Sequence, residues 1–347
     1  MDKRIAIRVD GTNRMGTGHV MRCLTLAHEL KRQGAQPLFC SKIMDPFLRA
    51  EAAQQGFGFE PLGDAGDIKE DAHLLGLAIE KNKCKVVILD GYDFVGEYIK
   101  AIREKAEFII NVDDTAHSTY VSDMILNQNI GAFPAMYDGK IPPYTQLFLG
   151  TDYVLLRDEF KQYRDKPRSF DVVRNVLIAF GGADLHNQVL KTLKALDHIN
   201  GEFAVTVVLG SSNPHKKEVE AFVAQNKRHV IIYQYVDFMA KLMSEADIVI
   251  SSGVATTWEV CYLGVPSVQT MLAENQISVL KELDQRGVVK GLGWYEDVSE
   301  HDISNAVRTL IDHKELRESM SRKGRTLVDG SGAQRVAATI LKNRVFG

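Results

Sequence analysis

His19 follows the glycines Gly16 and Gly18, between an apolar run at residues 4–9 and a helical pattern at residues 19–33. A neutral imidazole accepts a proton near pH 7, so a histidine held in this state can act as a general base. The positive end of a helix dipole disfavours a second positive charge, which favours the neutral form at the start of a helix. The alternative is a structural histidine that hydrogen-bonds a loop carbonyl.

Other side chains could support this chemistry. Asp10, one residue past the apolar run, could orient the second ring nitrogen of His19, or could be a solvated turn residue. Arg22 follows His19 by three positions, and this spacing puts both on one side of a helix. Tyr92 follows the apolar run 85–90 and could contact a ligand or only pack. We therefore predict that His19 is catalytic, and that the residues at ligand-binding positions in this half of the chain are Asp10, Gly16, Gly18, Arg22 and Tyr92.

The glycine-rich turn does not match a dinucleotide or nucleoside triphosphate site. A dinucleotide site needs a third glycine and an acidic residue about 20 positions later, at the end of the second strand. Met21 stands where the third glycine should be, and the second apolar run ends in Cys40-Ser41-Lys42 without an acid. The Gly-Lys-Ser/Thr of a phosphate-binding loop is also missing. No cofactor is expected.

A second constellation lies in the segment 251–266, where a small-residue turn precedes Thr256 and Thr257 at a helix start. Backbone N–H groups and hydroxyls at a helix N-terminus suit a diphosphate. Glu259 could accept hydrogen bonds from a ribose diol, whereas the alternative is an ordinary capped helix with a first-turn glutamate. Further ligand contacts are expected at two other strand-to-helix turns, at Gly182 and at Glu274, Asn275 and Gln276.

Asp113 and Asp114 form a carboxylate pair after the apolar run 107–112. The pair could belong to a metal site, a helix cap or an interdomain network. Hard cations such as Mg²⁺ and Ca²⁺ need several oxygen ligands, and no third ligand is evident nearby. We therefore expect no metal site.

Short apolar runs alternate with helical patterns throughout the chain, as in parallel β-α-β units covered on both faces. The charged stretch 159–174, interrupted by Pro167, is the most linker-like segment. The predicted fold is therefore α/β, with two Rossmann-like doubly wound domains facing across a cleft. We place the N-terminal, histidine-bearing domain at residues 1–160 and the second, nucleotide-binding domain at 161–347, with the last helix able to pack back on the first. Ligands bind such sheets at the carboxyl ends of the strands.

The composition is that of an ordinary globular protein, with 347 residues, 45% of them hydrophobic and 25% charged. A formal net charge of −3 lacks the basic character of nucleic-acid binders. The four cysteines lie far apart without a metal-binding spacing, which favours a reducing compartment. No signal-peptide pattern follows Met1, and no apolar run approaches the roughly 18–20 residues that span a bilayer. We expect a cytoplasmic protein without membrane insertion, a monomer or weak homodimer that binds a small-molecule substrate.

The motifs, taken together, resemble the PseG and SpsG family of UDP-sugar hydrolases and spore-coat polysaccharide proteins. The resemblance covers nearly the whole chain, and its strongest parts are a G-x-G-H-x-x-R turn, a Y-x-L-L-R-x-E-F stretch and a TTWE…LG-P…ENQ run. These parts lie in RVDGTNRMGTGHVMRCLTLA (8–27), VILDGY (87–92), NVDDTAHSTYVSDMILNQN (111–129), FLGTDYVLLRDEF (148–160), AFGGADLHN (179–187) and ADIVISSGVATTWEVCYLGVPSVQTMLAENQ (246–276).

The resemblance implies a GT-B fold related to MurG-type glycosyltransferases, in which the C-terminal domain holds UDP and the N-terminal domain supplies the catalytic groups. It implies hydrolysis of UDP-2,4-diacetamido-2,4,6-trideoxy-β-L-altropyranose in pseudaminic acid or related surface-polysaccharide biosynthesis. His19 matches the catalytic histidine and Tyr92 a sugar-side tyrosine. The positions that match nucleotide-sugar contacts in the second domain are Thr256, Thr257, Glu259, Asn275 and Gln276.

The chain departs from the family pattern at two turns. Thr115-Ala116-His117 replaces the usual Leu-Ala-type stretch after the aspartate pair, and Gly253-Val254-Ala255 replaces a turn that usually contains a serine. A different sugar or nucleotide is compatible with these changes. The alternatives to the hydrolase are a GT-B glycosyltransferase that uses a UDP-sugar donor, a non-catalytic nucleotide-sugar-binding protein, and a hydrolysing UDP-sugar 2-epimerase.

Overall fold

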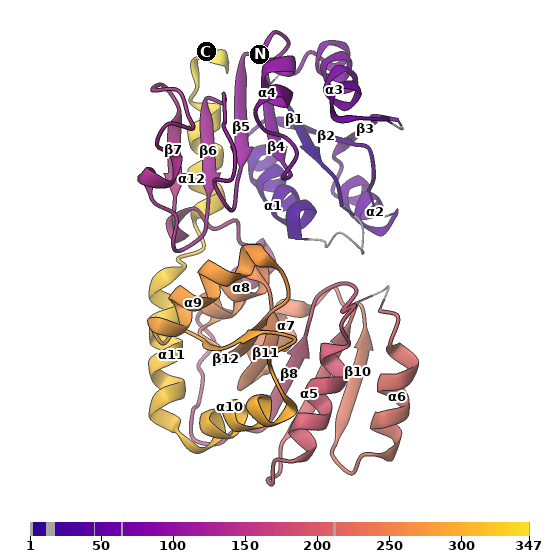
Figure 1. The fold of residues 1–347 in the computed structure, drawn as a ribbon, viewed down its shortest axis with the longest axis vertical. Helices are drawn as coiled ribbons and strands as arrows, with labels where there is room; N and C mark the ends of the chain where they lie inside the picture. Colours follow the sequence, from indigo (N-terminus) through magenta and orange to yellow (C-terminus); the bar gives the residue numbers. More distant parts are fainter. Residues whose placement is uncertain (1–2, 12–17, 45, 64, 211–212, 347) are drawn as a thin grey trace. The chain divides into compact units, whose positions relative to one another are not determined.

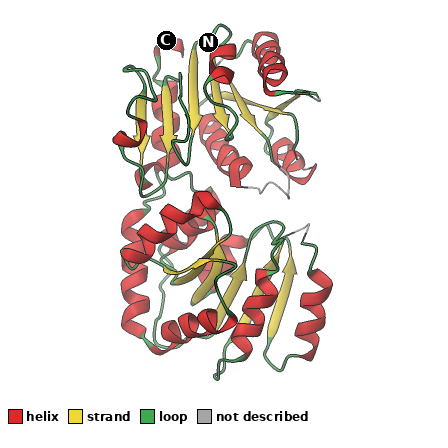
Figure 2. Ribbon diagram, viewed as in Figure 1, coloured by secondary structure: helices red, strands yellow, loops and turns green. Residues whose placement is uncertain are grey.

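The computed structural model describes residues 3–11, 18–44, 46–63, 65–210 and 213–346. The chain forms two compact units: unit 1 comprises Met1–Leu156 and Ser331–Gly347, and unit 2 comprises Arg157–Gly330. Each unit contains one parallel β-sheet covered by helices, drawn in yellow and red in Figure 2.

The sheet of unit 1 has seven parallel strands in the order β3-β2-β1-β4-β5-β6-β7 (Figure 1). Its inner strands β4 and β5 are buried along their whole length, which is why they read as continuous apolar runs. In the ladder between β1 and β4, Val9 pairs with Asp90, so these two strands end side by side. The strands are β1 (Arg4–Val9), β2 (Gln36–Ser41), β3 (Gly58–Pro61), β4 (Val86–Asp90), β5 (Phe108–Val112), β6 (Met124–Asn127) and β7 (Gln146–Leu149).

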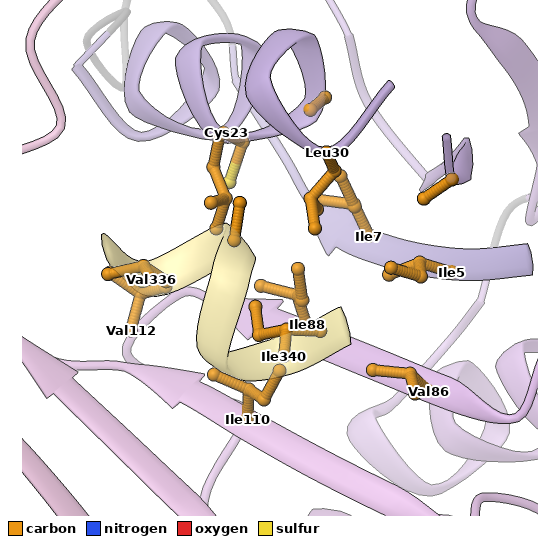
Figure 3. Close-up of a cluster of buried hydrophobic side chains, with 14 of the residues drawn as sticks. Ile5, Ile7, Cys23, Leu30, Val86, Ile88, Ile110, Val112, Val336 and Ile340 are labelled. Atoms are coloured by element: carbon orange, nitrogen blue, oxygen red, sulfur yellow. The ribbon is translucent and has the colours of Figure 1, made fainter. Parts of the chain in front are cut away.

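Helices cover both faces of this sheet. Residues of α1 and α12 share one hydrophobic core with the sheet, and residues of α3 and α4 share another. In Figure 3, Val336 of α12 lies beside Val112, and Ile340 lies beside Ile88 and Ile110, so the C-terminal helix is part of the core of unit 1. The helices are α1 (Gly18–Arg32), α2 (Pro46–Gln54), α3 (Ile68–Asn82), α4 (Glu97–Arg103) and α12 (Gly332–Leu341).

The sheet of unit 2 has six parallel strands in the order β10-β9-β8-β11-β12-β13. They are β8 (Asn175–Ala179), β9 (Ala204–Leu209), β10 (Val230–Gln234), β11 (Ile248–Ser252), β12 (Ser267–Met271) and β13 (Lys290–Trp294). The helices are α5 (Gln188–Asp197), α6 (Lys216–Gln225), α7 (Met239–Glu245), α8 (Val254–Leu263), α9 (Ile277–Gln285), α10 (Glu300–Asp312) and α11 (Lys314–Leu327).

Two parallel-sheet α/β units confirm the predicted fold class. The strands β3, β6, β7 and β13 were not predicted, because each has only four or five residues and lacks a long apolar run. The segment expected as a linker packs on unit 2 instead: Phe160, in a short 3₁₀ helix, is 0% exposed. Among the helices of the described residues, none has the length and apolar character needed to cross a bilayer.

Candidate active site

A pocket with about 230 Å³ of empty space opens in unit 1 where β1, β4 and β5 end. Parallel strands present their carboxyl ends at one edge of the sheet, and the loops that follow them meet there. Its polar lining residues come from the start of α1, from β5 and from the loops after β4 and β5, and include His19, Arg22, Tyr92, Asn111, Asp114 and His117.

His19 is held by a buried carboxylate at the end of β4. Its Nδ1 lies 2.6 Å from Oδ1 of Asp90, whose side chain is 0% exposed. Burial alone would raise the pKa of Asp90, but the charges and hydrogen bonds of Arg22 and His19 outweigh it and hold that pKa well below its usual range. Nδ1 also lies 3.0 Å from Nη2 of Arg22, which only donates, but the carboxylate of Asp90, which only accepts, is the closer neighbour. We therefore assign the proton to Nδ1, and in the neutral ring Nε2 then keeps its lone pair. This is the arrangement of a general base.

Arg22 binds two carboxylates, Asp90 at the end of β4 and Asp114 in the loop after β5. Its Nε lies 2.7 Å from Oδ2 of Asp90, and its Nη1 lies 2.8 Å from Oδ1 of Asp114. Burial opposes the charge of Arg22, yet the two carboxylates raise its pKa well above the usual value. Cys23 also donates to Asp90, at 3.3 Å. Nη2 of Arg22 is a further donor, 2.7 Å from Oδ1 of Asp90. With four donors around it, the Asp90 side chain has little freedom, so the imidazole that it holds is also fixed.

Asp10 does not orient His19, and that expectation is wrong. Its Oδ2 accepts a hydrogen bond from Arg8 at 2.7 Å, and its Oδ1 accepts the backbone N–H groups of Lys42 and Ile43 at 2.9 and 3.0 Å. Asp10 therefore ties the end of β1 to the loop after β2. Its assignment to substrate binding stays a prediction.

The sequence analysis did not assign a role to Asp90. An acidic residue at the carboxyl end of a fully apolar strand was a signal that could have found it, because such a position faces the ligand-binding edge of a parallel sheet. The sequence does not show that β1 and β4 are neighbours in the sheet. This pairing brings His19 and Asp90, 71 positions apart, into contact.

Tyr92 lies beside His19, with the ring centroids 5.3 Å apart and the rings edge to face. Its hydroxyl is 3.5 Å from Oδ2 of Asp114, and the side chain is 42% exposed. The predicted neighbourhood of His19, Arg22 and Tyr92 is therefore present in the structure. Whether Arg22 and Tyr92 contact substrate stays a prediction.

Asp113 and Asp114 have different hydrogen-bond partners. Both line the pocket, but Asp114 accepts from Arg22, whereas Asp113 accepts the hydroxyls of the buried Tyr120 and Tyr137 at 2.8 and 2.6 Å. Burial, followed by the charge of Asp113, raises the pKa of both tyrosines. Among the described residues, no group of three or more His, Cys, Asp and Glu is arranged to hold a metal ion.

Gly18 is the first residue of α1, whereas Gly16 lies outside the described residues. A Cβ built on Gly18 meets none of the described atoms within 4 Å, and its backbone is not in the left-handed region. The fold as described does not require a glycine there, and the assignment of Gly18 to ligand binding stays a prediction.

We expect Gly18→Ala to leave the protein as stable as the wild type or more stable, by up to about 1 kcal/mol, because alanine favours a helix over glycine. A methyl group in the path of a ligand costs about 1–3 kcal/mol, so the KM for substrate should rise about tenfold. Thermal unfolding and steady-state kinetics measure the two effects. Gly131→Ala is the matched control, since its Cβ also meets none of the described atoms and Gly131 is not among the predicted ligand-binding positions. An unchanged KM in Gly18→Ala would remove this backbone from the binding site.

In unit 2, a second recess of about 200 Å³ lies at the start of α8. The helix follows Gly253, whose φ of 85° suits glycine. A Cβ on Gly253 would lie 3.5 Å from Nε2 of Gln276, so the turn before α9 approaches the turn before α8. Thr256 is partly exposed, but Thr257 is 2% exposed and its hydroxyl contacts the Gly253 carbonyl and, at 2.8 Å, Oε1 of Gln269. A diphosphate would therefore meet the backbone here more readily than the Thr257 hydroxyl.

Glu259 forms an ion pair that the sequence analysis did not anticipate. Its Oε1 lies 2.9 Å from Nε and 2.8 Å from Nη2 of Arg157. Burial raises the pKa of Glu259 against the opposing charge of Arg157. The arginine fixes the carboxylate in one orientation. Ribose binding by Glu259 stays a prediction.

The remaining predicted residues of unit 2 lie in two loops. Glu274 is exposed and Asn275 partly exposed, in the same 3₁₀ helix as Gln276. Gly182 follows β8 and packs against Gly210, where a Cβ would collide with the Gly182 carbonyl at 1.7 Å. Of these residues, Gln276 lines the recess at α8, whereas Gly182, Glu274 and Asn275 do not.

Comparisons with known proteins give one family match in the second half of the chain and matches along most of its length. The model of the glycosyltransferase family 28 C-terminal domain matches residues 176–337. The chain is 26% identical over 343 residues to the spore coat polysaccharide biosynthesis protein SpsG of Bacillus subtilis, with 97% of each chain covered. It is 25% identical over 287 residues to the UDP-2,4-diacetamido-2,4,6-trideoxy-beta-L-altropyranose hydrolase of Campylobacter jejuni, covering 82% of this chain and 97% of the relative.

The fold is similar to that of MurG from Acinetobacter baumannii, with a TM-score of 0.74 and 18% sequence identity. The match covers 98% of this chain and 100% of MurG, so both units share the GT-B architecture of that structure. The chain is therefore homologous over nearly its whole length to SpsG, and its unit 2 carries a domain related to the C-terminal domain of family 28 glycosyltransferases.

Proposed function

We propose that this protein hydrolyses a UDP-linked sugar to the free sugar and UDP. The observation that carries the proposal is His19, which lines a pocket with its Nδ1 held by the buried carboxylate of Asp90. An imidazole fixed in this tautomer offers Nε2 as a base, which can activate a hydroxyl group by taking its proton. Water is the simplest such nucleophile, and the similarity to a UDP-sugar hydrolase supports it.

In the proposed reaction, Nε2 of His19 takes a proton from water as the water oxygen bonds to the anomeric carbon. The bond from that carbon to the diphosphate oxygen breaks, and UDP leaves with the electron pair. The backbone N–H groups at the start of α8 and the dipole of that helix would stabilise the diphosphate. Gln276, next to Gly253, is positioned to contribute a side-chain contact there.

We propose a 2,4-diacetamido-2,4,6-trideoxyhexose as the sugar, in pseudaminic acid or related surface-polysaccharide biosynthesis. The support is the motif resemblance together with the similarity to the Campylobacter hydrolase of that UDP-sugar. The departure at Thr115-Ala116-His117 falls on a turn whose last residue lines the pocket of unit 1, so a difference from the relative's substrate would fall on the substituents of the sugar.

The test is incubation with a panel of UDP-, GDP- and CMP-sugars in buffer made with H₂¹⁸O, without any acceptor. We expect one UDP-sugar to yield free sugar, and mass analysis to find UDP without ¹⁸O, because water attacks carbon and not phosphorus. UDP that carries ¹⁸O would contradict attack at the anomeric carbon. Binding of UDP without any product would favour a nucleotide-sugar-binding protein instead.

A glycosyltransferase is the second candidate, favoured by the family 28 model on residues 176–337 and by the MurG-like fold. In that case His19 would deprotonate an acceptor hydroxyl in place of water. Rapid release of free sugar without an acceptor would exclude this candidate as the main activity. A UDP-sugar left intact until an acceptor is added would favour it.

A further inference from the structure

A strained turn follows β5 at the edge of the pocket. Ala116 has a φ of 51°, in the left-handed region that an alanine rarely adopts. Such a conformation persists only where surrounding contacts impose it, and it is frequent at functional sites. Ala116 is buried, and it is one residue from His117, which lines the pocket.

The contacts that impose this conformation come from both sides of the residue. The backbone N–H of Ala116 donates to Oδ2 of Asp113 at 2.8 Å, and the ammonium of Lys140 donates to the Ala116 carbonyl at 2.7 Å. Asp113 is in turn held by the hydroxyls of Tyr120 and Tyr137. The direction of the chain at His117 is therefore determined by the buried core of unit 1.

His117 uses both ring nitrogens to join this turn to the loop that carries Tyr92. Its Nε2 lies 3.1 Å from the Tyr92 carbonyl, and its Nδ1 lies 3.0 Å from Oγ1 of Thr115. A carbonyl only accepts, so Nε2 carries a proton, and Nδ1 of the neutral ring accepts from the threonine hydroxyl. The rings of His117 and Tyr92 have centroids 6.1 Å apart, in an edge-to-face arrangement.

The loop between β4 and α4 is attached to the fold at two further points. Asn111 donates from Nδ2 to the Phe94 carbonyl at 2.8 Å, and the N–H of Gly96 donates to the Thr119 carbonyl at 2.9 Å. Both bonds hold the far part of the loop, whereas the bond from His117 holds Tyr92 itself. The rings of His19 and His117 thus both lie edge to face with the Tyr92 ring.

We propose that His117 is a positioning residue, which fixes Tyr92 beside His19 for binding of the sugar. The inference rests on the proposed function, because it assigns Tyr92 to the sugar side of the substrate. His117 would act through Tyr92 on the affinity for the sugar, and not on the proton transfer at His19.

The first test compares His117→Ala with His117→Gln, whose amide nitrogen can replace Nε2 as the donor to Tyr92. Loss of one hydrogen bond of this kind should raise the KM for the UDP-sugar about two- to tenfold in His117→Ala. The kcat should change less than the KM, UDP should bind as before, and His117→Gln should recover most of the loss. His73→Ala, an exposed histidine on α3, is the matched control.

The second test does not depend on activity. In protein labelled with 3-fluorotyrosine, the ¹⁹F resonance of Tyr92 is assigned by its absence in Tyr92→Phe. We expect His117→Ala to shift or broaden that resonance, and His117→Gln and His73→Ala to leave it near the wild-type position. An unmoved Tyr92 resonance in His117→Ala, or a lowered kcat with an unchanged KM, would overturn the proposal. A wild-type protein without hydrolase activity would refute the proposed function, while the ¹⁹F result would still decide whether His117 positions Tyr92.

Discussion

Replacement of His19 by asparagine is expected to lower the turnover number by about 10²–10⁴-fold, the usual contribution of a positioned general base. Asparagine keeps a polar side chain near Asp90 but has no nitrogen that accepts a proton near pH 7. UDP should bind to the variant as to the wild type, because the nucleotide is assigned to unit 2. Single-turnover hydrolysis of the UDP-sugar and titration with UDP measure the two quantities.

The control for this substitution is His28→Asn on the same helix. His28 is exposed and nine positions from His19, which places it on the opposite side of α1. His28→Asn should retain wild-type turnover. If His19→Asn also retained it, His19 would have no part in the reaction, and the proposed mechanism would be refuted whatever the identity of the substrate.

The fold class followed from the sequence because the inner strands of both sheets are buried on two faces. Such strands read as continuous apolar runs, as in residues 85–90 and 107–112. Short strands gave weaker signals: β6 is buried but only four residues long, and β13 contains two glycines. The sequence analysis allowed the last helix to pack back on the first domain, but local pattern could not decide this, since the burial of Ile340 depends on strands more than 200 positions away in the sequence.

Contacts within the candidate site could be predicted where the two residues are close in the sequence, but not where they are far apart. His19 and Arg22 share one turn of α1, so their contact follows from helical spacing. Asp90 reaches His19 only because β4 is the neighbour of β1 in the sheet. Asp10 is closer to His19 in the sequence, but its carboxylate accepts hydrogen bonds from Arg8 and from the loop after β2.

In unit 2, the residue types indicated a binding site, but the sequence did not reveal which way the side chains point. A threonine pair at a helix start was consistent with phosphate binding, yet Thr257 faces the core and contacts Gln269 on β12. Glu259 was considered for a ribose, and Arg157, 102 positions earlier, holds one of its oxygens. Helical periodicity alone does not decide which of two adjacent hydroxyls is buried, because this depends on the sheet beneath the helix.

Replacement of Asp90 by asparagine is expected to lower turnover to a similar extent, by about 10²–10⁴-fold. An Asp–His pair of this kind keeps the imidazole in the tautomer that leaves the other nitrogen free. Asparagine can donate to Nδ1, which favours a proton on Nε2 and so removes the base. Asp123→Asn is the matched control, because Asp123 pairs with Arg103 at 2.7 Å and does not line the pocket. Wild-type turnover in Asp90→Asn would show that His19 needs no carboxylate partner.

The same substitution has an effect on stability that depends on pH. The pKa of Asp90 is lower in the folded protein than its unfolded value of about 3.9, so its ion pair stabilises the fold fully above that pH. This contribution is lost as the pH falls through the lower, folded pKa. The difference in unfolding free energy between wild type and Asp90→Asn should therefore be constant from pH 6 to about pH 5 and shrink as the pH falls below about 4, as measured by urea titrations down to pH 3. A constant difference over this whole range would contradict an ionised Asp90 in the folded state.

A double variant that combines His19→Asn with Asp90→Asn shows whether Asp90 acts through His19 or independently of it. If Asp90 acts by holding the imidazole, Asp90→Asn should cost almost nothing further in protein that already carries His19→Asn, because the group it orients is gone. Independent effects would multiply, to a loss of about 10⁴–10⁸-fold in the double variant. Arg22 keeps Asp114 as a partner in all of these variants, so the comparison does not leave its buried charge without a carboxylate. A double variant no slower than His19→Asn alone would identify Asp90 as the residue that positions the base, and a multiplicative loss would give Asp90 a separate contact with the reacting groups.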